Sequence, residues 1–194
     1  MALLIPARGA LTRRDRANTL RGVVAAGLAV VLGAAGAVHA QALELAVKAT
    51  YLYKFAPFVS WPAQAWSAPN APLVICVQGS DPFGPMLDRA TAGQMVGAHP
   101  VQVRRVPRLD AGSGCQIAYV AGGAAQSQAQ ALQAVDGAPV LTITDEAQHA
   151  SGKGIVQLVL DGGKVRFSID AGQADRNGVA ISSKLLALAV AVKR

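Results

Sequence analysis

The feature that most restricts the fold is a pair of strand-length segments joined by a glycine turn near the C-terminus. Ile155 to Leu160 is a continuous apolar run, and Lys164 to Asp170 alternates apolar with polar residues. Between them lies Asp161-Gly162-Gly163, a sequence that readily adopts the positive φ angles of a tight hairpin turn. The period of two predicts a β-hairpin whose inward face carries Phe167.

Upstream of this hairpin, short apolar runs alternate with segments of helical periodicity. Strands are predicted over Leu73 to Val77, Val101 to Val106, Cys115 to Val120 and Pro139 to Ile143. Helices are predicted over Gln41 to Phe58, Pro82 to Ala90 and Ala124 to Val135, and from Ser182 to the closing Lys193-Arg194. Such alternation is typical of βαβ units. We therefore expect a single compact α/β domain: a mixed β-sheet flanked by helices, with a C-terminal hairpin and helix.

The first forty residues have the three-part pattern of a secretory signal. A basic stretch, Arg13 to Arg21, precedes the seventeen uncharged residues Gly22 to Val38, and small side chains stand at Val38 and Ala40. We expect residues 1–40 to be a signal peptide cleaved after Ala40, and residues 41–194 to be an exported domain. A membrane anchor is the alternative. It is disfavoured because a spanning helix needs about 20 strongly apolar residues, whereas only Val23 to Leu32 is strongly apolar.

The positive charge is concentrated in this N-terminal segment. Five arginines and one aspartate give residues 1–40 a net charge of +4, out of +7 for the whole chain. The remaining excess is small for a nucleic-acid-binding surface, so we expect no nucleic-acid partner.

The two cysteines, Cys76 and Cys115, both fall in the exported part. An oxidising compartment favours a disulfide between them. Two buried free thiols are the alternative. A zinc site is less favoured, because sulfurs 39 residues apart lack the close ligand pairs of such sites.

Reactive side chains do not converge in any pattern typical of an enzyme. Only His99 and His149 could serve a histidine-dependent triad in the exported part, and both lie in predicted loops. Asp145 and Glu146 with His149 form the nearest candidate set, but polar loop residues need no special role. We therefore expect no catalytic residues, no metal and no cofactor.

Glycine-containing turns offer no nucleotide-binding motif. The turn Gly79-Ser80-Asp81-Pro82 follows a predicted strand but lacks the three spaced glycines of a dinucleotide site. Gly152-Lys153-Gly154 lacks the upstream glycine and the Ser or Thr of a P-loop.

An aromatic stripe runs along the first predicted helix of the exported part. It comprises Tyr51, Phe55 and Phe58, and Trp61 follows shortly after. Such a stripe usually packs into the core, and lining a pocket is the alternative. Tyr51, Phe58 and Trp61 are therefore the candidate residues for a ligand or partner pocket.

Three stretches of the chain resemble signatures of the YfiR family. In order, they are Lys48-x-x-Tyr51-Leu52-x-x-Phe55 with Trp61-Pro62, then Ile75-Cys76-Val77-x-Gly79-x-Asp81-Pro82-Phe83-Gly84, and finally Gly152-x-Gly154-Ile155 through Val165-x-Phe167-x-Ile169 to Ile181-Ser182-Ser183-Lys184-Leu185-Leu186-x-Leu188-Ala189. The resemblance covers essentially all of residues 43–192.

The resemblance implies a periplasmic homodimer without known catalytic residues. It implies repression of an inner-membrane diguanylate cyclase through the periplasmic region of the cyclase, with an outer-membrane lipoprotein that sequesters the repressor. The output would be the level of cyclic-di-GMP, which sets biofilm formation against motility. Cys76 and Cys115 resemble the positions of a family disulfide, whereas a second cysteine pair that family members can carry near Gly152 is absent.

Other classes of function stay open at this point. The main alternative is a periplasmic small-molecule-binding module of an envelope sensing or uptake system, and a third is an envelope hydrolase. The signature residues are typical of fold determinants and do not mark an interface.

Overall fold

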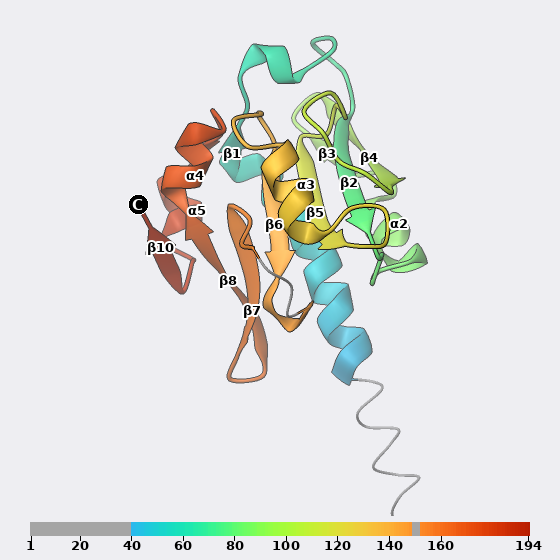
Figure 1. The fold of residues 1–194 in the computed structure, drawn as a ribbon, viewed down its shortest axis with the longest axis vertical. Coiled ribbons are helices and arrows are strands. Elements are labelled where there is room, and N and C mark those ends of the chain that lie inside the picture. The colour runs from blue at the N-terminus through green and yellow to red at the C-terminus, as the bar shows by residue number, and fades with distance from the viewer. Residues whose placement is uncertain (1–39, 149–151) are drawn as a thin grey trace, which may run out of the picture. The chain divides into compact units, whose positions relative to one another are not determined.

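The strand-length runs pair side by side in one eight-stranded sheet, in the order β10-β8-β7-β6-β5-β2-β4-β3 (Figure 1). The computed structural model describes residues 40–148 and 152–194. The strands of this sheet are β2 (Leu73–Gly79), β3 (Met95–Val96), β4 (His99–Val106), β5 (Ile117–Gly122), β6 (Leu141–Asp145), β7 (Val156–Asp161), β8 (Lys164–Asp170) and β10 (Ala191–Lys193). Two short strands, β1 (Val59–Ser60) and β9 (Ala180–Ile181), form a separate antiparallel pair.

The centre of the sheet is parallel and its edges are mixed. β4, β2, β5, β6 and β7 run parallel to one another. β3 pairs with β4 and β8 with β7 in antiparallel fashion, and β10 pairs with β8 in parallel. Parallel strands are covered on both faces and therefore have continuous apolar sequences. The burial of β2 and β5 along almost their whole length agrees with this. The predicted mixed sheet is confirmed.

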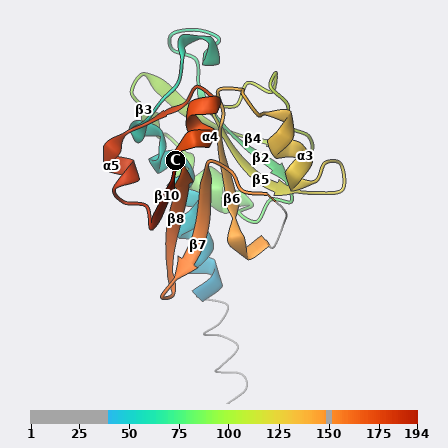
Figure 2. The ribbon, with the colours of Figure 1, turned by 60° about the vertical axis from the view of Figure 1, so that its left-hand side comes forward.

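Helices cover both faces of the sheet (Figures 1 and 2). Residues 40–54 are helical, and the other helical elements are η1 (Ala56–Phe58), η2 (Ala63–Ala65), α2 (Pro85–Thr91), α3 (Gln128–Ala134), η3 (Glu146–Gln148), α4 (Ala171–Arg176) and α5 (Ser183–Leu186). One core layer joins the sheet to the N-terminal helix and to α2 through Leu52 and Leu87. The opposite layer joins it to α3 through Ala131. Residues 43–194 thus form one compact α/β unit.

The predicted hairpin forms at the glycine turn, with Phe167 on its buried face. Asp161 pairs with Lys164, and Leu158 pairs with Phe167. Gly162 and Gly163 supply φ angles of 54° and 72°, which L side chains rarely adopt, so this turn requires glycine.

The helix predictions are wrong in their bounds. The first predicted helix ends at residue 54 and not at Phe58, and the helix predicted from Ala124 begins at Gln128. Pro82 does not open the second helix, because α2 begins at Pro85. The carboxylate of Asp81 accepts hydrogen bonds from the backbone N–H groups of Phe83 and Gly84 at 2.7 and 3.2 Å, and this turn delays the helix.

The C-terminal helix is also shorter than predicted. Ser182 caps it as expected, accepting from the Leu185 N–H at 3.3 Å, but α5 ends at Leu186. Val190 then donates its N–H to the Phe167 carbonyl at 2.9 Å, and the chain continues as β10 beside β8. Lys193 lies in this strand and not at a helix end.

Candidate functional site

Two of the three candidate aromatic residues line the same cavity. Tyr51 and Phe58 border a hollow of about 210 Å³ between the N-terminal helix, β8 and α5, which we call the helix hollow. Its lining is Tyr51, Lys54, Phe55, Phe58, Arg166, Phe167, Leu185 and Leu188. Trp61 lies elsewhere, because the chain turns away after η1 and enters the β1 strand.

The floor of the helix hollow is a packed aromatic cluster. The Phe55 and Phe167 ring centroids are 5.0 Å apart, and Tyr51 meets Phe167 edge-on at 6.0 Å. Such edge contacts stabilise a core beyond the area they bury. Tyr51 and Phe58 are half-buried, so their rings belong partly to the core and partly to the hollow.

Trp61 lines a second, larger hollow, which we call the tryptophan hollow. It has a volume of about 460 Å³ and is bordered by Trp61, Trp66 and His99 among others. The rings of Trp66 and His99 are stacked at 3.8 Å, and Trp61 meets Trp66 edge-on at 6.0 Å. The His99 Nδ1 donates to the Ala71 carbonyl at 2.7 Å, and Trp61 Nε1 donates to the Gln116 carbonyl at 3.0 Å, so both rings are held in place.

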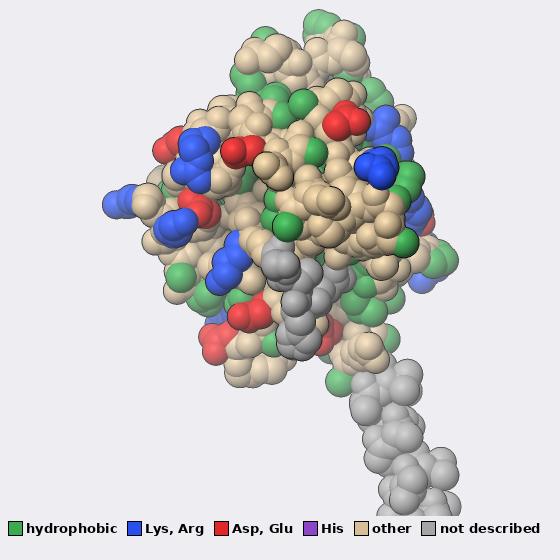
Figure 3. Space-filling view, in the orientation of Figure 1, with side chains coloured by type: hydrophobic (Ala, Val, Ile, Leu, Met, Phe, Trp, Pro, Cys, Tyr) green, Lys and Arg blue, Asp and Glu red, His purple; other side chains and the backbone are tan. Residues whose placement is uncertain are grey.

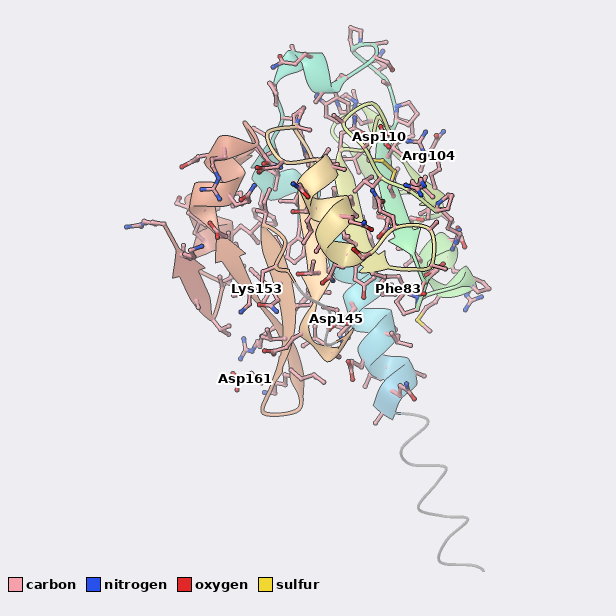
Figure 4. All side chains as sticks on the ribbon, viewed as in Figure 1. Phe83, Arg104, Asp110, Asp145, Lys153 and Asp161 are labelled. Atoms are coloured by element: carbon pink, nitrogen blue, oxygen red, sulfur yellow. A yellow bond between two sulfur atoms is a disulfide. The ribbon has the colours of Figure 1, made fainter. Side chains whose placement is uncertain are left out.

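Cys76 and Cys115 form a disulfide, as the sequence predicts, with Cα atoms 5.8 Å apart. Cys76 lies on β2, and Cys115 precedes β5, the strand beside it. Arg104 covers the bond from β4: its Nη2 lies 3.6 Å from the Cys76 sulfur and 3.5 Å from the Cys115 sulfur, and it also donates to the Ser113 carbonyl. Figure 4 shows Arg104 at the β4 edge of the sheet.

A buried ion cluster joins the N-terminal helix to the end of β6. Lys48 is 1% exposed, and its ammonium lies 2.5 Å from the carboxylates of both Asp145 and Glu44. Burial lowers the pKa of Lys48, but the hydrogen bonds and charges of these two carboxylates outweigh it, so the pKa is raised. Burial, together with a hydrogen bond to Asp145 and the negative charge there, raises the pKa of the Tyr119 phenol.

Sequence pattern alone predicts a loop position for Asp145 and no partner for Lys48. The sequence does contain a signal for this buried ion pair. Lys48 stands seven residues before Phe55 and so lies on the apolar face of the helix. A charge on such a face needs a buried partner of opposite sign.

The crevice where α/β sheets commonly bind ligands is closed here by the chain itself. Such ligands lie beyond the carboxyl ends of the strands, where the direction of connection reverses, which in this sheet is between β2 and β5. The Ser80 N–H donates to the Gly122 carbonyl at 2.9 Å, and a Cβ on Gly79 would lie 2.1 Å from that oxygen. The Gln78 side chain accepts from the Gly122 N–H and donates to the Gln126 carbonyl.

Three arginines, Arg104, Arg105 and Arg108, lie on or just after β4, and among them Arg105 is the one that forms ion pairs in the described part of the chain. Arg105 pairs with Asp81 at 2.8 Å and with Asp88 at 2.7 Å, and these hydrogen bonds raise its pKa while holding the pKa of Asp88 below its usual value. On the face shown in Figure 3, positive and negative side chains are interspersed. His149, the third member of the Asp145 and Glu146 set, lies outside the described residues.

Comparison with known protein families gives a match over most of the chain. The family model described as YfiR/HmsC-like matches residues 45–190. No curated protein matches the sequence. In the part of the chain that the structure describes, no helix combines the length and apolarity needed to cross a bilayer.

Proposed function

We propose, from the premise that this chain belongs to the YfiR/HmsC-like family, that it is a periplasmic regulator that represses an inner-membrane diguanylate cyclase. The observation that carries the proposal is the family match over residues 45–190, which begins in the N-terminal helix, runs past α5 and includes every strand of the eight-stranded sheet except β10. Repression works by binding to the periplasmic region of the cyclase and lowers cyclic-di-GMP in the cytoplasm.

Binding alone can control an enzyme on the far side of a membrane. The regulator must prefer one conformation of the periplasmic region, and its effect is limited to the difference between its affinities for the two conformations. A hundredfold preference corresponds to about 2.7 kcal/mol and reduces a half-active cyclase to about one per cent activity.

The family resemblance also supports two further partners. One is a second copy of this chain in a homodimer, and the other is an outer-membrane lipoprotein that sequesters the repressor. Export of the domain by cleavage after Ala40 places it where both partners and the cyclase can be reached.

Deletion of the gene tests the regulator proposal. Cellular cyclic-di-GMP should rise in the deletion strain and fall again when an exported copy is supplied. A copy without residues 1–40, held in the cytoplasm, should fail to restore repression. Unchanged cyclic-di-GMP in the deletion strain, with the candidate cyclase expressed, contradicts the proposal.

The second candidate function is that of a periplasmic small-molecule-binding module. The tryptophan hollow favours it, because about 460 Å³ lies in the usual range of ligand pockets and its walls are aromatic. The chain has two tryptophans, and both border this hollow, so their fluorescence reports directly on it. Saturable quenching by neutral aromatic probes, benzamide and benzyl alcohol, supports this function, and a linear collisional response contradicts it.

A further inference from the structure

We propose that the helix hollow is the docking site for an acidic, amphipathic helical segment of the cyclase, which inserts one large apolar side chain beside Phe167. This inference rests on the proposed function and deepens it by naming the surface and the chemistry of the partner segment.

The size of the helix hollow fits a single anchor side chain. Apolar protein cavities of about 150 Å³ take up a benzene molecule, and this hollow has a volume of about 210 Å³. Its floor is formed by Phe55 and Phe167, which are 3% and 6% exposed and fixed by their edge contacts. A rigid, largely apolar pocket of this kind is what the central anchor of a protein interface fills.

One wall of the helix hollow is an apolar side chain directed to solvent. Leu188 borders the hollow, yet it is 62% exposed. Val190 follows two residues later and is 49% exposed. A partner that fills the hollow would therefore also cover apolar surface next to it, so the contact extends beyond one side chain.

The charges at the helix hollow have a single sign. Lys54 and Arg166 line it, Lys184 precedes the lining residue Leu185, and no acidic side chain of the described residues borders it. In the described ranges, none of these three cations makes an ion pair.

Some exposed cations elsewhere in the described ranges do form ion pairs, whereas others, such as Arg108, are as unpaired as the three at the hollow. Arg105 pairs with Asp81 and Asp88, and Lys193 pairs with Asp170. An apolar pocket edged by unpaired cations is complementary to an apolar side chain flanked by carboxylates. A short amphipathic helix presents this combination, because residues three and four apart share one face.

The test measures binding of the mature protein to the detergent-solubilised, full-length cyclase at low and at high salt. Lys54→Glu and Arg166→Glu should each weaken binding about tenfold at low salt, and less at high salt, because these charges are screened. Leu188→Ser should weaken binding at least tenfold at both salt concentrations. In cells, the same variants should leave cyclic-di-GMP raised.

Matched controls separate docking from folding and from general charge. Arg108→Glu makes the same charge change on an exposed residue at the β4 side, and Leu160→Ser makes the same apolar-to-polar change on a residue that is 49% exposed. Both should bind and repress as the unaltered protein does, and all five variants should keep its melting temperature.

Each outcome is decisive for one of the two claims. If the unaltered protein represses and the three hollow variants repress equally well, the docking site is wrong and the regulator proposal survives. If the variants change the oligomeric state, the occupant is a second copy of this chain. If they abolish binding to anionic phospholipid vesicles but not to the cyclase, the occupant is a lipid surface. Either result overturns the inference. If the unaltered protein neither binds nor represses, both claims fail.

Discussion

Lys48 lies on the face of the N-terminal helix that packs against the sheet, where a charge is kept only with partners of opposite sign. Taking an ion pair out of water costs so much that such a pair adds little net stability. Removing only one partner of the pair is strongly destabilising, because the other partner is left charged and buried.

Lys48→Ala should therefore lower the free energy of unfolding by about 3–5 kcal/mol. The double change Lys48→Met with Asp145→Leu should recover most of that loss, because the one carboxylate left without its partner, Glu44, keeps 25% of its side chain exposed to water. Lys54→Ala, on the exposed side of the same helix, is the control and should change stability by less than about 0.5 kcal/mol. Urea denaturation measures all three, and a Lys48→Ala variant as stable as the control contradicts the buried pair.

The same cluster predicts a loss of stability at alkaline pH. The folded protein holds the pKa values of Lys48 and Tyr119 above their ordinary values of 10.5 and 10.0. A raised pKa means that the folded state binds the proton more tightly. The stabilisation is therefore fully present below about pH 10 and is lost as the pH rises through the folded values.

Unfolding curves between pH 8 and 11.5 measure this loss. The double variant Lys48→Met with Asp145→Leu should lose less stability over that interval than the unaltered protein does. Equal losses in the two proteins would show that other groups govern the alkaline transition.

The disulfide is the other residue-scale feature with a measurable contribution. Replacing Cys76 and Cys115 together with Ser should lower the free energy of unfolding by about 2–4 kcal/mol, the usual range for a native crosslink. Thiol labelling of the denatured, unreduced protein should find no free thiol. Two labels per chain would show that the bond does not form.

At the scale of elements, local patterns predict the hairpin well and the C-terminal segment poorly. Alternation in Lys164 to Asp170 and the two turn glycines are properties of contiguous residues. The segment after Leu186 is apolar enough for a helix, but Val192 pairs with Ile169 of β8 instead. That pairing joins residues far apart in sequence, and no local pattern contains it.

Phe167 tests the inward face of the hairpin. Phe167→Ala should destabilise the fold by about 3–5 kcal/mol, because the ring packs between Tyr51 and Phe55 and truncation leaves a cavity. Leu160→Ala, on the exposed part of β7, is the matched control and should have little effect. An unchanged melting temperature for Phe167→Ala would place this ring in an exposed interface instead of the core.

At the scale of the whole molecule, helical spacing explains why part of the candidate site could be predicted. Tyr51 and Phe58 are seven residues apart, a separation that predicts one helical face, and both border the helix hollow even though the α-helix ends at residue 54 and Phe58 lies in η1. Trp61 follows the break at Pro57, so its position depends on where the chain turns. The partner of Lys48 lies 97 residues away and requires knowledge of the sheet order.

The N-terminus of the exported protein stays a prediction of the sequence. The mature chain should begin at Gln41, because Ala40 ends an apolar segment with a small residue. Intact mass spectrometry of the protein from a periplasmic fraction measures this. A mass that includes residues 1–40 would indicate a retained membrane anchor.

The disulfide has a mechanical consequence as well. It closes a covalent ring of the chain that contains α2, β3 and β4, and the two cysteines at its ends are 39 positions apart in the sequence. When the two termini of a single molecule are pulled apart, force passes through the sulfurs and bypasses this ring. The stretched, oxidised chain is then shorter than the reduced chain by about 140 Å, at roughly 3.5 Å per extended residue. The strands β3 and β4, which lie entirely inside the ring, therefore bear no tension along the chain while the bond is intact.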